Sequence, residues 1–180
     1  MDTQFLTRVR EQGKLLGKRE VMKYQAAIGS LMYIATCTRP DISLAVGILS
    51  QFMVAPTDYQ MIAVRRVVRY LKGTIELGLM IAPQAGDTIR STVSASDSLS
   101  YAPKVMKAFT DSDYAAAFTR RSRTGYCIYW GSTLIAWRSR KQSVVSLSTA
   151  EAELYALTDG AKELYYGVRI AAEMCMGYPF

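Results

Sequence analysis

The hydrophobic pattern of this sequence changes once, across a segment rich in serine, glycine, alanine and proline that runs from Pro83 to Pro103. Before this segment, apolar residues recur at the spacing of amphipathic helices, and after it they alternate as they do in strands. Two patterns in succession, with no strand–helix alternation, are typical of an α+β fold. We therefore expect a helical region at 1–82, a linker at 83–103 and a strand-rich region at 104–180.

Three helices are predicted in the first region. The first carries an apolar stripe that we expect to be buried, made of Tyr24, Ile28, Leu31, Met32 and Ala35. The second begins at Pro40 and Asp41, because proline is tolerated in a first helical turn. The third begins at a capping box formed by Thr57 and Gln60. A short apolar strand is expected to follow at 77–81.

The third helix has one basic face and one apolar face. Its apolar side is predicted from Val64, Val67, Val68 and Leu71, and its basic side from Arg65, Arg66, Arg69 and Lys72. The chain has a net charge of +7, which suits a polyanionic partner such as nucleic acid. A solvated basic face is the ordinary interpretation of this helix, and a face that tracks phosphates is the alternative.

Three strands and a long helix are predicted in the last region. The strands are expected at 104–113, 124–130 and 133–139, with Gly131 and Ser132 as the turn between the last two. One weaker strand is expected at 88–93. The final helix is expected at about 149–174, and its predicted buried stripe is Ala150, Leu154, Leu157, Ala161, Leu164 and Val168.

Composition excludes several classes of function. The sequence has no histidine, which excludes histidine bases, histidine-containing triads and histidine-ligated zinc. Its three cysteines are odd in number and widely spaced, so a disulfide framework is not expected. No leader peptide and no apolar run long enough to span a membrane is evident, so we expect an intracellular protein that is neither secreted nor membrane-bound. Catalysis, if present, falls to carboxylates.

Acidic side chains stand at both ends of a basic stretch in the last region. Asp111 and Asp113 end the first strand, Glu151 and Glu153 open the long helix, and no acidic residue lies between Asp113 and Glu151. The intervening basic residues are Arg120, Arg121, Arg123, Arg138, Arg140 and Lys141. This layout suits a divalent cation held between carboxylates, with a phosphate backbone attracted by the arginines. A solvated strand end is the alternative interpretation of the aspartates.

The two glutamates differ in their expected roles. Ser148 and Glu151 match a capping box, which gives Glu151 a structural role at the helix start. Glu153 lies outside that box, on the face of Ala150 and Leu157, where it is expected to border the buried stripe. A carboxylate at the edge of a core is unfavourable unless it is paired or binds a metal. Glu153 is therefore the glutamate that we expect to have a functional role.

The motifs "RRVVRYLKGT", "FTDSDYA", "RSRTGYCIYWGSTLIAW" and "SLSTAEAEL", in this order, resemble the C-terminal part of copia-type long-terminal-repeat retrotransposon polyproteins. The resemblance covers nearly the whole chain. It implies that 1–82 corresponds to the thumb and connection helices of a reverse transcriptase. It also implies that 104–180 is a truncated ribonuclease H-like fold of three antiparallel strands and a long helix.

The resemblance carries a chemistry as well. Ribonuclease H cuts the RNA strand of an RNA–DNA hybrid with magnesium ions held by carboxylates, and manganese accepts the same oxygen ligands. By resemblance, Asp111 and Glu153 are the catalytic, metal-binding residues. The expected partners are an RNA–DNA hybrid or another nucleic acid, and the rest of the polyprotein. The basic residues expected to contact nucleic acid are Arg65, Arg66, Arg69, Arg138, Arg140 and Lys141.

Several positions depart from the family pattern. The polymerase's aspartate pair does not occur, Tyr114 stands in place of a tryptophan, and Ala116 and Ala117 stand in place of glycine and aspartate. The fourth strand and the later carboxylates of a ribonuclease H are expected after the long helix and are not found. We therefore expect the chain alone to be inactive and its first strand to keep an open edge. The alternatives are a non-catalytic nucleic-acid-binding remnant and a pseudogene product.

Overall fold

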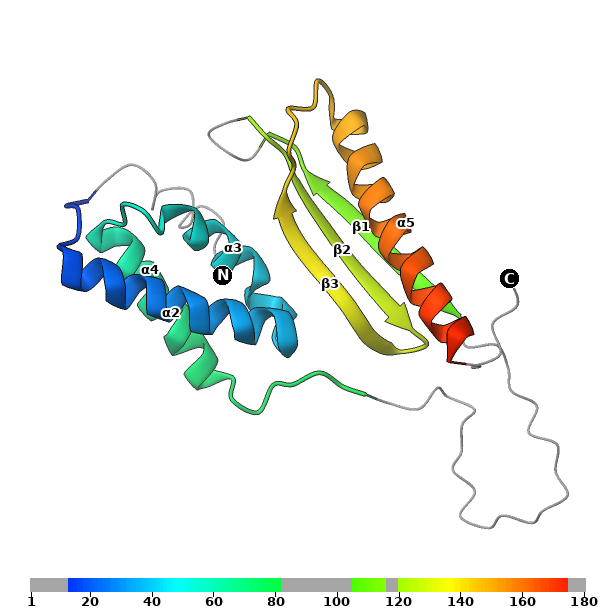
Figure 1. The fold of residues 1–180 in the computed structure, drawn as a ribbon, viewed down its shortest axis with the longest axis horizontal. Helices are drawn as coiled ribbons and strands as arrows, with labels where there is room; N and C mark the ends of the chain where they lie inside the picture. The colour runs from blue at the N-terminus through cyan, green and yellow to red at the C-terminus, as the bar shows by residue number, and fades with distance from the viewer. Residues whose placement is uncertain (1–12, 82–104, 116–119, 175–180) are drawn as a thin grey trace, which may run out of the picture. The chain divides into compact units, whose positions relative to one another are not determined.

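The computed structural model describes residues 13–81, 105–115 and 120–174 (Figure 1). The chain divides into two compact units, Met1–Leu79 and Met80–Phe180, and each is described here by itself. The first is helical, and the second combines a three-stranded antiparallel sheet with one long helix. The fold class is therefore α+β, as the sequence predicts. The expected linker at 83–103 and the weak strand at 88–93 lie outside the described residues.

The helical unit contains the three predicted helices. They are α2 (Lys18–Cys37), α3 (Ser43–Leu49) and α4 (Asp58–Gly73), with short 3-10 helices η1 (Pro40–Ile42) and η2 (Ser50–Phe52) on either side of α3. The capping box of Thr57 and Gln60 at the start of α4 is confirmed. The strand expected at 77–81 is wrong. No described strand pairs with these residues, and an apolar run without a pairing partner has no ladder to join.

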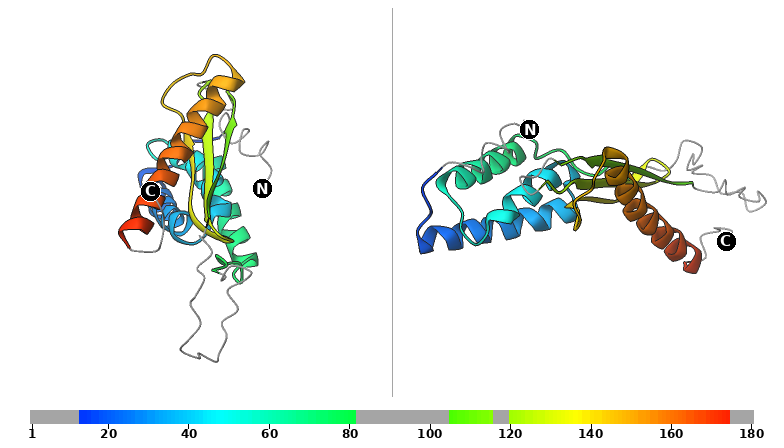
Figure 2. Two further views of the ribbon diagram at one scale, coloured as in Figure 1. Left: turned by 90° about the vertical axis from the view of Figure 1, so that its right-hand side faces the viewer. Right: turned by 90° about the horizontal axis from the view of Figure 1, so that it is seen from above.

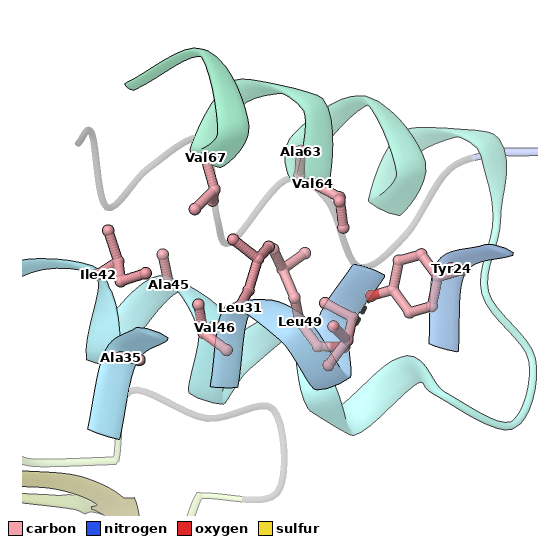
Figure 3. Close-up of a cluster of buried hydrophobic side chains, with 11 residues drawn as sticks. Tyr24, Leu31, Ala35, Ile42, Ala45, Val46, Leu49, Ala63, Val64 and Val67 are labelled. Carbon is pink, nitrogen blue, oxygen red and sulfur yellow. Dashed lines mark hydrogen bonds between the residues drawn. The ribbon is translucent and has the colours of Figure 1, made fainter. Parts of the chain in front are cut away.

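The core of the helical unit lies between α2, α3 and α4 (Figure 3). Its buried apolar residues are Tyr24, Ile28, Leu31, Ala35, Ile42, Ala45, Val46, Leu49, Ala63, Val64 and Val67. The Tyr24 hydroxyl donates to the Leu49 carbonyl oxygen at 2.7 Å, which satisfies the polar end of a buried ring. Met32 and Val68 were expected in this core but are 45% and 50% exposed. Each follows a buried residue directly, and about 100° per residue turns it outward.

A buried arginine ties the start of η1 to the end of α4. Arg39 is 7% exposed, and its Nη2 donates to Asp41 Oδ2 at 2.7 Å and to Thr74 Oγ1 at 2.7 Å. The Tyr70 hydroxyl donates to the same Asp41 oxygen at 2.8 Å. The Arg39 guanidinium holds the pKa of the Asp41 carboxyl below its usual range, against the opposing effect of burial. This network of charged hydrogen bonds satisfies groups that the apolar core cannot.

The strand unit follows the predicted order. Strands β1 (Met106–Asp113), β2 (Arg123–Trp130) and β3 (Thr133–Lys141) form an antiparallel sheet in the order β1-β2-β3, and helix α5 (Thr149–Glu173) follows. Gly131 has a φ of 61° in the tight turn between β2 and β3, a conformation that favours glycine. Both tryptophans of the chain, Trp130 and Trp137, lie in this unit.

Helix α5 lies along one face of the sheet (Figure 2). The residues that it buries there are small. Ala152, Ala156 and Gly160 are buried at four-residue intervals. A Cβ added to Gly160 would lie 2.3 Å from Thr110 Cγ2, so the helix approaches β1 more closely than a larger residue would permit. Small side chains at this helix–sheet contact bring the backbones of α5 and β1 together.

The predicted buried stripe of α5 is therefore wrong. Leu154 and Leu157 are 62% and 55% exposed, because the row of small residues takes the place against the sheet that was assigned to them. Hydrophobicity alone favoured the leucines, whereas the close approach to β1 leaves no room for them. Among the described residues, no helix is both long enough and apolar enough to cross a membrane.

Candidate active site

Strand β1 presents two different faces. Met106 and Thr110 contact α5, at Gly167 and Gly160 respectively, so the even-numbered residues of β1 face the helix. Lys107, Phe109, Asp111 and Asp113 alternate with them and are exposed on the other face. Asp111 pairs with Gly125 of β2, near the end of the strand. The sequence-predicted aspartate thus lies on a regular strand, with its side chain in solvent.

Glu153 lies beside the residue that follows Asp111. The backbone N–H of Ser112 donates to Glu153 Oε1 at 3.3 Å, which links the first turn of α5 to the open edge of β1. Glu153 does border the packed face of α5, as expected, but through Ala152 and Ala156. The neighbours predicted from the sequence, Ala150 and Leu157, are exposed.

Glu151 has a capping role. Ser148 Oγ accepts from the Glu151 N–H at 3.1 Å, and the Glu151 carboxylate accepts from the Leu147 N–H at 2.7 Å. In an ideal capping box, the glutamate would accept from the N-cap residue itself, so here it reaches one residue further back. The start of α5 therefore separates the glutamates, because Glu151 binds the preceding loop while Glu153 binds β1.

A buried glutamine positions this helix start, and the sequence analysis missed it. Gln142 Nε2 donates to Thr124 Oγ1 at 3.1 Å and to the Ala152 carbonyl oxygen at 3.0 Å, and Ser146 Oγ donates to Gln142 Oε1 at 3.0 Å. These bonds join β2, the loop after β3 and the first turn of α5. The sequence shows only a polar residue between a strand and a helix cap. Such a residue cannot be distinguished from an ordinary loop residue. Ser112 was also missed, and its Oγ is buried without a hydrogen-bond partner among the described residues.

The basic residues of β3 do not form a single patch. Arg138 and Arg140 share the helix side of the sheet, where Arg140 Nη2 bonds Asp159 Oδ2 of α5 at 3.1 Å. Arg138 contacts Tyr126, whose pKa is raised by burial first and by the Glu163 carboxylate to a lesser degree. Lys141 alternates to the opposite face, in the row of Asp113 and Arg123.

The remaining basic residues lie in the other unit. Arg65, Arg66 and Arg69 are exposed on α4, on the side turned away from buried Ala63, Val64 and Val67. Asp113 in the strand unit is likewise exposed, opposite Arg123 in the register. Each unit therefore carries its own part of the residues that the sequence analysis selected.

The candidate ligand atoms are of the kind that a hard cation binds. Asp111 and Glu153 offer carboxylate oxygens, the ligands that magnesium and manganese prefer. Among the described residues, however, there is no group of three or more acidic, histidine or cysteine side chains placed to hold a metal. The described residues therefore supply two candidate oxygen ligands, and we derive no cleavage step from them.

Comparison with known proteins identifies relatives. A retrovirus-related Pol polyprotein from transposon TNT 1-94 of Nicotiana tabacum is 36% identical over 169 residues, which is 93% of this chain and 11% of that protein. The corresponding polyprotein from transposon RE2 of Arabidopsis thaliana is 35% identical over 153 residues, 84% of this chain and 9% of that protein. The chain thus spans about a tenth of the length of these polyproteins.

A third relative, named secreted RxLR effector protein 161, comes from Plasmopara viticola. It is 35% identical over 141 residues, which cover 78% of this chain and 87% of that protein. No family model matches the chain, and no solved structure matches it. The chain is similar over most of its length to retrovirus-related Pol polyproteins from copia-type transposons.

Proposed function

We propose that this chain belongs to the copia-type Pol family and corresponds to the thumb and connection helices of a reverse transcriptase followed by part of a ribonuclease H domain. In this proposal, 104–180 supplies Asp111 and Glu153 to the metal-dependent cleavage of RNA in RNA–DNA hybrids. The observation that supports it best is the hydrogen bond from the Ser112 N–H to Glu153 Oε1. It brings a helix carboxylate to the strand position next to Asp111.

The roles of the residues follow from their contacts. Asp111 and Glu153 would hold Mg²⁺ or Mn²⁺, and the ion would polarise the scissile phosphate. The Ser112 N–H orients the Glu153 carboxylate, and Gln142 fixes the first turn of α5 through the Ala152 carbonyl oxygen. Glu151 accepts from the Leu147 N–H at the start of α5 and is given no role in the proposed site. The proposal thus assigns the metal to Asp111 of β1 and Glu153 of α5, and the hydrogen bond from Ser112 to Glu153 supports it.

We propose further that the chain by itself is inactive. Cleavage of a phosphodiester by two ions needs carboxylates on both ions, and electrostatic stabilisation of the transferring phosphate accounts for most of the catalysis. Two described carboxylates supply part of that set. The remaining ligands would come from other residues of the polyprotein, which is therefore the proposed partner.

A hybrid-cleavage assay with Mg²⁺ or Mn²⁺ tests both statements. The chain alone is expected to cleave no faster than background, and addition of the rest of the polyprotein is expected to restore cleavage. Asp111→Asn and Glu153→Gln should each abolish the restored activity, whereas Glu151→Gln should retain it.

The outcomes separate the two proposals. Cleavage by the unsupplemented chain that is lost in Asp111→Asn would refute the inactivity but support the site. Restored cleavage that survives both substitutions would refute the assignment of Asp111 and Glu153. The Glu151→Gln variant controls for a general effect of neutralising a carboxylate at the start of α5.

A second candidate function is nucleic-acid binding without catalysis, through the exposed basic face of α4. Binding of an RNA–DNA hybrid should then weaken as salt rises. The logarithm of the binding constant should fall with the logarithm of salt concentration, with a slope of about 0.9 per phosphate contacted. Reversing the charge of Arg65 and Arg69 should reduce that slope, while Lys162→Glu, on the exposed surface of α5, should not. An affinity that does not change with salt would exclude this function.

A further inference from the structure

Ser112 carries two polar groups with different surroundings. Its backbone N–H donates to Glu153 Oε1 at 3.3 Å. Its side-chain Oγ is buried and has no hydrogen-bond partner among the described residues. A buried hydroxyl without a partner costs free energy, whereas an alanine methyl at the same position would not. The hydroxyl of Ser112 is therefore unfavourable in the fold as it stands, and stability alone does not account for it.

The neighbouring polar side chains on the helix side of the sheet are hydrogen-bonded. Ser112 lies opposite Thr124 in the register of β1 and β2, so both side chains face α5. Thr124 Oγ1 accepts from Gln142 Nε2 at 3.1 Å, and Gln142 also donates to the Ala152 carbonyl oxygen. This buried cluster holds the turn of α5 that carries Glu153. The unpaired hydroxyl of Ser112 thus borders a polar cluster that fixes the position of Glu153.

The Glu153 carboxylate is the best acceptor for this hydroxyl. The Ser112 N–H already contacts the carboxylate, and rotation about the Cα–Cβ bond moves Oγ relative to it without moving either backbone. An ionised carboxylate has two oxygens that accept several hydrogen bonds, and the N–H uses one of them. Thr124 Oγ1 is the neutral alternative. A hydrogen bond to a charged oxygen is the stronger of the two.

We propose that the Ser112 hydroxyl is a positioning group for Glu153, and that it donates to the Glu153 carboxylate when this carboxylate binds a divalent cation. The inference rests on the proposed metal site at Asp111 and Glu153. In the metal-free fold the exposed carboxylate is solvated, so the hydroxyl gains little from it. Once the carboxylate is held at the cation, two donors from one residue fix its plane and leave its other lone pairs for the ion.

Metal affinity and metal-free stability together test this role. The full chain is titrated with Mn²⁺, and free Mn²⁺ is measured by electron paramagnetic resonance. Ser112→Ala should raise the Kd for Mn²⁺ about tenfold, as loss of a group that orients a ligand does. It should not lower the urea midpoint of the metal-free chain, because it removes a buried hydroxyl that has no partner. A lower midpoint with an unchanged Kd would mean a purely structural role and would overturn the inference.

Three further variants separate this inference from the proposed site. Thr110→Val removes a hydroxyl from the same face of β1 and keeps the methyl that approaches α5, so its Kd for Mn²⁺ should equal that of the wild type. Asp111→Asn and Glu153→Gln should weaken binding more than Ser112→Ala does. If both weaken binding and Ser112→Ala does not, the role of Ser112 is overturned and the site stands. If neither weakens binding, or the wild type binds no Mn²⁺, the site and the role of Ser112 are overturned together.

Discussion

The two units bury their apolar surface in opposite ways. The helical unit encloses large side chains, with Tyr24, Ile28 and Leu49 completely buried among three helices. The described part of the strand unit buries chiefly Ile128, Tyr126 and the alanines of α5 against one face of the sheet. Leu147, Leu154 and Leu157 are exposed, as is Phe109, and no described strand pairs with the outer edge of β1. The helical unit thus buries a core of large side chains between its helices, whereas the described strand unit buries mainly small residues of α5 against its sheet.

This difference bears on how each unit is stabilised. A core of large residues stabilises the folded unit through the apolar area that it removes from water, at about 25 cal/mol per Å². A helix held to a sheet through alanine and glycine removes less area per residue and depends on a close fit. The helical unit should therefore be sensitive to lost volume, and the strand unit to added volume.

The largest effect is expected from removing volume in the helical unit. Leu49→Ala should lower its free energy of unfolding by about 3 kcal/mol, because a fully buried leucine leaves a cavity between α2 and α3. Urea titration followed by circular dichroism measures the change. Leu77→Ala, at an exposed leucine of the same unit, is the matched control and should cost less than about 0.5 kcal/mol. Equal losses of stability in the two variants would contradict the burial of Leu49.

Added volume tests the strand unit. Gly160→Ala should be less stable than Gly167→Ala by about 2 kcal/mol, because the new methyl meets Thr110 at 2.3 Å, whereas at Gly167 it meets the flexible Met106 at 3.4 Å. Both changes gain the same helix propensity, so thermal unfolding of the two variants isolates the clash. Thr110→Ser removes the clashing methyl and should restore most of the loss at Gly160. Equal stabilities of the two alanine variants would contradict the close approach.

A pH titration tests the charged network, which belongs to the helical unit. The pKa of Asp41 is lowered in the folded state, chiefly by its hydrogen bond with Arg39, from a reference value of 3.8. Its contribution is therefore present above about pH 4 and is lost as the pH falls through the folded-state pKa. Asp41→Asn should reduce stability at neutral pH by about 1 kcal/mol and remove this acid-dependent loss. Glu76→Gln should leave this acid-dependent loss of stability unchanged.

The smallest effects are expected at the start of α5. Ser148→Ala removes the acceptor for the Glu151 N–H and should destabilise the strand unit by about 0.5–1 kcal/mol. Glu151→Gln keeps a side-chain acceptor near the Leu147 N–H, so it should lower the free energy of unfolding by only about 0.3 kcal/mol. Chemical denaturation of both variants gives the order. A larger loss for Glu151→Gln would show that Glu151 does more than cap the helix.

The sequence predicted the three helices of the helical unit, the three described strands and α5, because periodicity and caps act locally, but it wrongly predicted a strand at 77–81. The capping box at Thr57, the turn at Gly131 and the extent of α5 are all of this kind. The sequence did not predict which side of α5 faces the sheet. That choice depends on the fit between Gly160 and Thr110, which are far apart in the chain.

The candidate site shows the same division. Capping geometry correctly predicted that Glu151 caps α5 and that Glu153 lies outside the cap, because both depend on positions within one helical turn. The partners of Glu153 could not be read from the sequence in the same way. The Ser112 N–H and the anchor at Gln142 become neighbours of α5 only when the strands pair. The roles of Asp111 and Glu153 in catalysis remain predictions for the cleavage assay.

The placement of the tryptophans has a practical consequence. Trp130 and Trp137 both belong to the sheet, and the helical unit contains tyrosines but no tryptophan. Indole fluorescence, excited selectively, therefore reports on the strand unit alone, whereas the far-ultraviolet signal of the helices reports on both units. One denaturation experiment with two optical probes can thus show whether the units unfold together or in separate transitions.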